Sequence, residues 1–256
     1  MRIGFYNIQG GTGKTTISGN IAYYLSSKAK TLYIDCDIYA GTGSLLFGFE
    51  DTPYTLNSYL SGNLDINDII HNYDELDVII SDTSPNSFNT DLNQRRMVDL
   101  IYELNNKYDI IIIDLPPNIV EGSLLFSSLN LDEKIVNKMI VIGEDSIPGV
   151  INTIKTKELL YAIDIDCIGV VLNKNRNIVE FEGILEDIIA VLPYEITVED
   201  QWIKGEPVVL ARNKFSKELS NLAEDLAEIY IKKDLASTRA LKVAKDLKDT
   251  KSNIKK

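Results

Sequence analysis

The sequence has few cysteines, no long hydrophobic run and no excess of positive charge. Its only cysteines, Cys36 and Cys167, are too far apart in the chain for a C-x-x-C motif. We therefore expect buried thiols in a reducing compartment. No apolar run approaches the roughly 18 residues of a membrane span, and the N-terminus lacks the basic-then-apolar layout of a signal peptide. These absences predict a cytoplasmic protein.

The charge balance is strongly acidic. The 256 residues include 38 Asp and Glu against 26 Lys and Arg, for a net charge of −12. A balance of this size argues against an extended nucleic-acid surface over the main body of the protein. The length and the 45% hydrophobic content suit one large or two small α/β domains with a buried core.

Residues 233–256 reverse this balance, with eight positive and three negative side chains and hence a net charge of +5. We predict a main domain over 1–232 and a basic, helical or flexible C-terminal tail over 233–256. Two interpretations stay open: a solvated polar tail, or peripheral contact with an anionic surface, membrane or DNA. The tail lacks the Phe or Trp that a strong interfacial helix would carry.

Apolar runs alternate with helical patterns along the main domain. Short apolar runs predict strands at 2–7, 31–37, 76–80, 108–114, 138–143, 167–173 and 191–193. Helices are predicted at 17–27, 55–62, 66–72, 91–106, 149–162, 179–189 and 215–232. The unbroken isoleucines at 110–113 indicate a central strand that is buried on both faces. The alternation predicts an α/β fold with a doubly wound, mostly parallel sheet flanked by helices.

A glycine-rich stretch joins the first expected strand to the first expected helix. It consists of Ile8, Gln9, Gly10, Gly11, Thr12, Gly13, Lys14, Thr15 and Thr16. Its glycines let backbone N–H groups point inward, and the following helix presents its positive end to an anion. We expect Lys14 to reach terminal phosphates and the Thr15 hydroxyl to bind Mg²⁺. The alternative is a glycine-rich turn without a ligand.

The doubled Gly10-Gly11 and the run from Gly13 to Thr16 resemble the deviant Walker A loop of the MinD/ParA superfamily of P-loop ATPases. The resemblance implies binding of ATP or ADP with Mg²⁺ by residues 9–16. That family usually carries a signature lysine just before the paired glycines, and here Gln9 stands in its place. A glutamine can donate a hydrogen bond but supplies no positive charge.

Three acids follow two of the expected strands. Asp114 ends the isoleucine strand and is followed by Leu115, Pro116 and Pro117, which resembles the family's Walker B and switch II arrangement. We expect Asp114 to hold Mg²⁺ opposite Thr15. Asp35 and Asp37 lie on one face of the second strand. The resemblance implies that Asp37 positions the attacking water, and we place Asp35 nearer the metal. Plain strand-ending acids are the alternative.

Base recognition is expected late in the chain. Asn173 ends a strand, and Asn175 stands where GTPases carry the Asp that pairs with guanine. An amide can bond the adenine edge, so adenine is favoured. Pro193 and the segment 205–208 resemble the second half of the MinD/ParA family. This likeness extends the resemblance to about residue 230 and places Pro193 with the adenine loop.

The resemblance implies an ATPase that forms a homodimer on ATP and acts as a switch for spatial positioning or regulation, with an activating protein partner. Lys14 and Asp37 are its expected catalytic residues. Because Gln9 lacks charge, we expect slow hydrolysis or another cation in that role, with candidates Arg95, Arg96, Arg176 and Arg212. The alternatives are an ATP-dependent ligase or amidotransferase-like enzyme, a slow-turnover nucleotide-binding scaffold, and a metal-insertion ATPase. The last needs paired thiolates near Asp114, where no cysteine lies.

Overall fold

The computed structural model describes residues 1–84, 92–117, 129, 135–136, 138–181 and 183–231. The prediction of a separate basic tail over 233–256 lies outside these residues. Within the described part of the chain, no helix combines the length and the apolar character needed to cross a bilayer.

The described strands form one eight-stranded sheet in the order β3-β4-β2-β5-β1-β6-β7-β8. Its strands are β1 (Arg2–Tyr6), β2 (Thr31–Asp35), β3 (His71–Tyr73), β4 (Leu76–Ile79), β5 (Ile110–Asp114), β6 (Lys138–Glu144), β7 (Asp166–Asn175) and β8 (Ile188–Pro193). Only β3 pairs antiparallel, against β4 at one edge. The predicted α/β fold with a mostly parallel sheet is therefore confirmed, and the isoleucine strand β5 lies between β1 and β2 near its centre.

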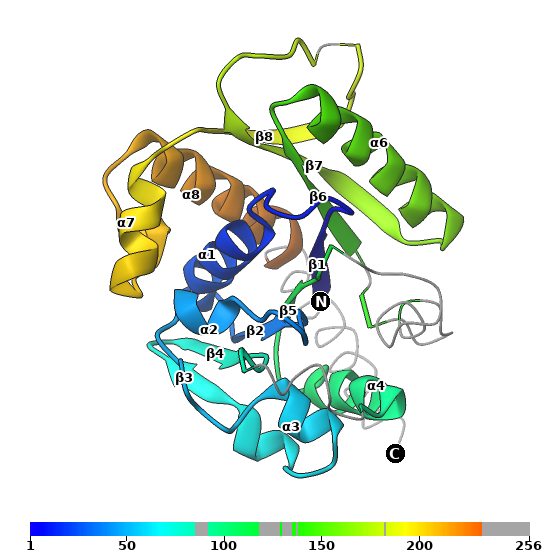
Figure 1. The fold of residues 1–256 in the computed structure, drawn as a ribbon, viewed down its shortest axis with the longest axis vertical. Helices are drawn as coiled ribbons and strands as arrows, with labels where there is room; N and C mark the ends of the chain where they lie inside the picture. Colours follow the sequence, from blue (N-terminus) through cyan, green and yellow to red (C-terminus); the bar gives the residue numbers. More distant parts are fainter. Residues whose placement is uncertain (85–91, 118–128, 130–134, 137, 182, 232–256) are drawn as a thin grey trace, which may run out of the picture.

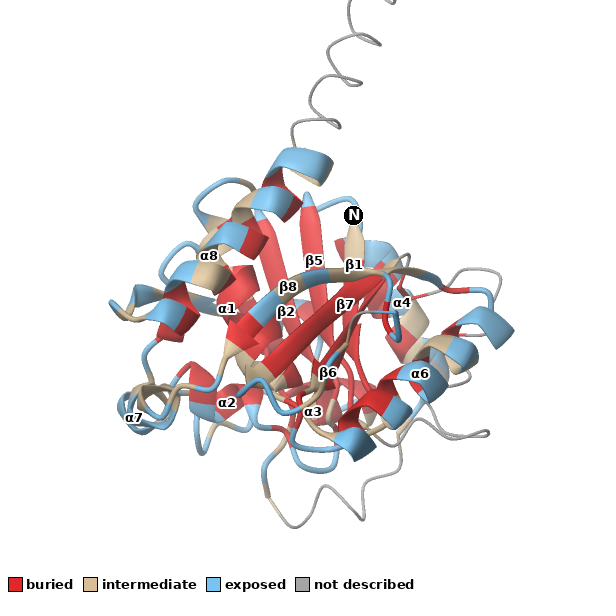
Figure 2. Ribbon diagram, turned by 90° about the horizontal axis from the view of Figure 1, so that it is seen from above, coloured by how far each residue is buried: buried red, intermediate tan, exposed pale blue. Residues whose placement is uncertain are grey.

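Helices cover both faces of the sheet (Figures 1 and 2). One face packs against α1 (Lys14–Ser26), α2 (Gly43–Leu46) and α8 (Lys214–Leu226). The other packs against α3 (Leu56–Leu60), α4 (Gln94–Leu104) and α6 (Ile147–Ala162). The short α7 (Thr197–Lys204) contacts the turn η3 (Val208–Leu210). Because β5 alternates its side chains between the two cores, Ile111 is buried on one side and Ile112 on the other.

The predicted helix at 179–189 is wrong. Apart from residue 182, the segment from 178 to 187 is irregular, and β8 begins at Ile188. The Asp145 carboxylate holds the start of this irregular segment, because it accepts hydrogen bonds from the backbone N–H groups of Arg176, Ile178 and Val179. Gly183, in the middle of the predicted helix, has φ +76°, a left-handed conformation that interrupts a right-handed helix.

Two other boundaries differ from the sequence-based expectation. The helix predicted at 66–72 is a short 3₁₀ turn, η1 (Ile66–Ile69), followed by the edge strand β3. Residues 71–73 form a strand because their backbone pairs with β4. The local pattern of apolar residues, from which the helix was predicted, carries no information about that pairing. The helix α1 begins at Lys14, three residues before the predicted start, so the glycine-rich loop leads directly into its first turn.

The central strand supplies a test of this packing. Ile112→Ala removes a fully buried side chain and is expected to lower the free energy of unfolding by about 2–5 kcal/mol, because a cavity replaces the lost contacts. Ile203→Ala is the matched control, since Ile203 is 84% exposed on α7 and its truncation should cost less than about 0.5 kcal/mol. Urea denaturation measures both; equal losses would contradict the central position of β5.

Candidate functional site

The glycine-rich loop lies at the carboxyl edge of the sheet, where it connects the end of β1 to the start of α1. Asn7 fixes its start: this fully buried side chain donates to Ile142 O at 2.9 Å and to Thr153 Oγ1 at 3.3 Å. Its own oxygen accepts from the backbone N–H of Gln9 at 2.8 Å. One asparagine thus joins the loop to β6 and α6. Ligands in open α/β sheets gather at this edge.

Gly13 and Asn173 meet at the end of the loop. The Asn173 amide nitrogen donates to Thr12 O at 2.8 Å, and a Cβ added to Gly13 would lie 2.3 Å from that nitrogen. Gly13 also has φ +94°, a left-handed conformation that favours glycine. The structure therefore brings the predicted base-recognition residue against the predicted phosphate loop. Within the described chain, the buried Asn173 Oδ1 and Thr12 Oγ1 have no hydrogen-bond partner.

Lys14 is a nearly buried cation in the loop. It is 7% exposed, and its Nζ donates to the backbone oxygen of Gln9 at 3.1 Å. Burial lowers the pKa of the Lys14 ammonium, and the negative charges of Asp114 and Asp37 oppose that shift. The lysine and these two acids, predicted together from separate motifs, do lie within electrostatic reach of one another.

Asp114 and Thr15 face each other across the same edge. Asp114 Oδ2 accepts from the Tyr33 hydroxyl at 3.1 Å, whereas its buried Oδ1 has no hydrogen-bond partner in the described chain. The Thr15 Oγ1 lies 3.3 Å from Thr42 Oγ1. Burial raises the pKa of the Asp114 carboxyl, while the Thr15 hydroxyl and the Lys14 charge counteract the rise. Mg²⁺ prefers oxygen ligands, and the Asp114 Oδ1 and the nearby Thr15 hydroxyl are both oxygen donors of this kind.

Asp35 and Asp37 take different positions. Asp35 is fully buried, and its two oxygens accept the backbone N–H groups of Asp37 at 2.9 Å and Gly43 at 2.8 Å. Burial and the charge of Asp114 raise the pKa of Asp35. Asp37 is only half-buried and accepts the N–H of Ala40 at 3.1 Å. Asp35 therefore organises the loop over 36–43, and its metal role stays a prediction.

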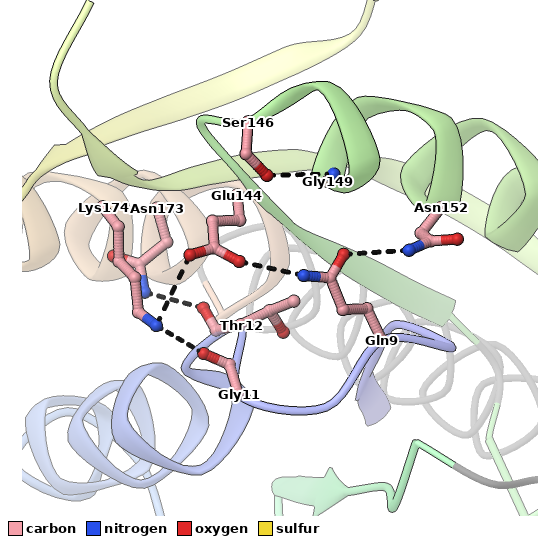
Figure 3. Close-up of polar contacts among 9 residues, drawn as sticks. All are labelled: Gln9, Gly11, Thr12, Glu144, Ser146, Gly149, Asn152, Asn173 and Lys174. Carbon is pink, nitrogen blue, oxygen red and sulfur yellow. Dashed lines mark hydrogen bonds and ion pairs between the residues drawn. The ribbon is translucent and has the colours of Figure 1, made fainter. Parts of the chain in front are cut away.

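Gln9 is held by the chain's own side chains (Figure 3). Its Nε2 donates to Glu144 Oε2 at 2.9 Å, and its Oε1 accepts from Asn152 at 3.0 Å. Lys174 Nζ donates to Gly11 O at 2.6 Å and lies 3.7 Å from Glu144 Oε1. Glu144 thus links the loop to the end of β7. Sequence reasoning missed Glu144, Asn152 and Lys174 as site residues; only Lys174, next to Asn173, had a local signal.

The remaining candidates lie around this centre. Pro193 ends β8 opposite Asn175 of β7, so it shares the edge with Asn173. Arg176 lies over the Tyr194 ring, with 3.7 Å from guanidinium carbon to ring centroid. The Arg96 guanidinium donates instead to backbone oxygens of Tyr59 and Leu64, away from the loop. The structure places neither arginine against the loop. The sequence also did not suggest a hydrogen bond that Trp202 Nε1 donates to Thr16 Oγ1 at 3.3 Å.

Comparisons with known proteins agree with this arrangement. Residues 1–155 match the AAA domain family. An uncharacterized ATP-binding protein of Methanocaldococcus jannaschii is 47% identical over 249 residues, which cover 97% of this chain and 94% of that protein. The septum site-determining protein MinD of Synechocystis is 28% identical over 217 residues, 79% of each chain. The fold matches the septum site-determining protein MinD complexed with Mg-ADP from Pyrococcus horikoshii, with a TM-score of 0.77 and 23% identity over 89% of this chain and 96% of that one.

Alanine substitutions at two glycines of the loop distinguish the cost of backbone strain from the cost of a side-chain collision. Gly11 (φ +74°) and Gly13 (φ +94°) are both left-handed, but a Cβ on Gly11 would meet nothing within 4 Å. Gly11→Ala should therefore cost about 1–2 kcal/mol of unfolding free energy, the strain alone. Gly13→Ala should cost at least about 1 kcal/mol more, because Asn173 must move. Equal losses in chemical denaturation would show that the contact between Gly13 and Asn173 does not constrain the loop.

Proposed function

Because the chain belongs to the AAA domain family and is an ATP-binding protein of the MinD/ParA type, we propose that it hydrolyses ATP slowly with Mg²⁺ and forms a homodimer when ATP is bound. The dimer would serve as a switch for spatial positioning or regulation. One observation carries the proposal: around one glycine-rich loop lie a nearly buried lysine and three buried polar oxygens that have no hydrogen-bond partner among the described residues. The unpartnered oxygens belong to Thr12, Asp114 and Asn173.

The phosphate side of the proposal rests on Lys14 and the glycines. The nearest atom to a Cβ on Gly10 is 3.8 Å away and Gly11 has open space, so a phosphate can approach the backbone N–H groups there. Among the described residues, the one hydrogen bond of the Lys14 ammonium goes to the backbone oxygen of Gln9, and burial penalises its charge. An anion in the loop would restore favourable electrostatics. On the base side, Asn173 Oδ1 offers an acceptor to the adenine amino group, beside Pro193.

The metal side rests on Thr15 and Asp114. Among the described residues, no group of three or more His, Cys, Asp or Glu side chains forms a metal site. Such a sparse donor set suits Mg²⁺, which keeps waters and substrate phosphates as ligands and takes few from the protein. When bound, the ion would neutralise charge on the transferred phosphoryl group. The unpartnered Asp114 Oδ1 and the Thr15 hydroxyl are the groups we assign to hold it.

Two side chains bear on the rate of hydrolysis. Asp37, half-buried beside the loop, is the residue we assign to orient the attacking water. Gln9 carries no charge, and both ends of its amide are engaged within the chain by Glu144 and Asn152. It therefore stabilises the loop and adds no positive charge to the transition state, which supports slow turnover.

The oligomer test compares nucleotides directly. With Mg²⁺ and ATP, the protein should elute from gel filtration with light scattering as a dimer, and with ADP as a monomer. Lys14→Ala should stay a monomer under both conditions and should lose ATP affinity by at least about tenfold, because it removes the buried cation. Lys107→Ala is the control, since Lys107 forms an exposed ion pair with Glu103. A monomer with ATP would refute the switch, and full ATP binding by Lys14→Ala would refute the site.

The role of Gln9 is tested by restoring charge. Gln9→Lys puts an ammonium on a longer side chain at residue 9, which can extend past Glu144 toward the phosphates, and should raise the hydrolysis rate by roughly tenfold or more, by analogy with cationic fingers in phosphoryl transfer. Gln9→Ala is the comparison variant: it removes the same hydrogen bonds, adds no charge and should not accelerate turnover. Steady-state phosphate release measures all three proteins. An unchanged rate in Gln9→Lys would show that residue 9 does not limit hydrolysis.

A further inference from the structure

The surface helix α7 contacts the first turn of α1 through one side chain, Trp202. None of the residues of α7 is buried, but Trp202 packs partly against the core that α1 shares with α8. Trp202 Nε1 donates to Thr16 Oγ1 at 3.3 Å. Thr16 ends the glycine-rich stretch and is the third residue of α1. The chain's single tryptophan therefore touches the proposed phosphate site from outside the loop.

This contact determines how the Thr16 hydroxyl can act. An indole N–H only donates, so Thr16 Oγ1 is the acceptor of the bond, and the hydroxyl proton stays available for a second one. Within the described chain, the Thr16 hydroxyl donates to no other group. Thr15 differs, because its hydroxyl interacts with Thr42 and with the Asp114 carboxyl. Of the two neighbouring hydroxyls, Thr16 is thus the one with a free proton.

The backbone of Thr16 is fixed as well. The fully buried Asn20 donates to Thr16 O at 2.7 Å, and its own oxygen accepts the N–H of Val209 at 2.9 Å. Val209 belongs to η3, which contacts α7. The N-terminal turn of a helix has backbone N–H groups without partners and a positive end, so an anion is the favoured acceptor for the free proton there.

We propose that Trp202 is a positioning residue for nucleotide binding, an inference that rests on the ATP site proposed above. By donating to Thr16 Oγ1, Trp202 directs the hydroxyl proton to a phosphate oxygen of the bound nucleotide. It also strengthens that contact, because a hydroxyl that accepts one hydrogen bond is polarised toward donating another. The segment with α7 follows β8, which ends at the predicted base-side residue Pro193. The phosphate is therefore one near the base, which ATP and ADP share.

A double-mutant cycle on the full chain, with affinities from isothermal titration in Mg²⁺, tests the proposal. Trp202→Phe keeps an aromatic ring but removes the donor, and should weaken ATP and ADP binding by about three- to tenfold each. Thr16→Val should weaken both by about tenfold or more, because a hydrogen bond to a charged group is lost. In the Thr16→Val background, Trp202→Phe should change the affinity by less than about twofold. Thr16→Ser keeps the hydroxyl and should preserve the full effect of Trp202→Phe.

Ile203→Ala is the matched control on the same helix: its side chain is 84% exposed, and both affinities should stay within about twofold. Because Trp202 is the only tryptophan, its fluorescence should change saturably with ATP, at the midpoint found by titration. The inference is overturned, with the ATP site intact, if Trp202→Phe binds ATP as wild type does, if its effect is equal with and without the Thr16 hydroxyl, or if emission stays constant at saturation. A wild-type protein that binds no ATP would overturn both proposals.

Discussion

The carboxyl edge of the sheet depends on an imbalance of buried charge. Lys14 interacts with Asp114 and Asp37, and Asp114 interacts in turn with Asp35; the carboxyls of Asp35 and Asp114 are at most 2% exposed. Burial raises the pKa of both buried carboxyls and lowers that of the lysine, so each group is held in an environment that opposes its charge. A magnesium–phosphate ligand adds cation and anion together at this edge. Its binding would therefore stabilise the fold as well as fill the site.

The features that could be predicted from the sequence are those with a local signal. The spacing of Gly10, Gly11 and Gly13 before Lys14 identified the loop, and two of them are needed there because Gly11 and Gly13 have a left-handed backbone and Gly13 also lies against Asn173. The isoleucines at 110–113 predicted a central strand, since burial on both faces leaves no alternation of polar residues. Both signals lie within a few residues, and the mostly parallel sheet that they predict is confirmed.

The features that could not be predicted depend on distant partners. Gln9 reaches Glu144 and Asn152, which lie 135 and 143 residues away and come from β6 and α6. No pattern around residue 144 indicates that partner. The irregular segment after β7 also has a distant partner, because the carboxylate that accepts its first amides belongs to Asp145, more than thirty residues earlier. Helix propensity is a weak preference that contacts within the folded protein override.

The engagement of Gln9 shapes how the proposed switch would operate. Two hydrogen bonds fix the loop before any ligand arrives, so less ordering entropy is lost when a nucleotide binds. The same bonds hold the side chain against Glu144 and Asn152, and because an amide is uncharged it would add no positive charge to a phosphoryl group. In the proposed switch, residue 9 would therefore favour binding over turnover. In a protein whose dimer persists while ATP is intact, slow hydrolysis lengthens the dimeric state, and the lifetime of that state is what a positional or regulatory switch sets.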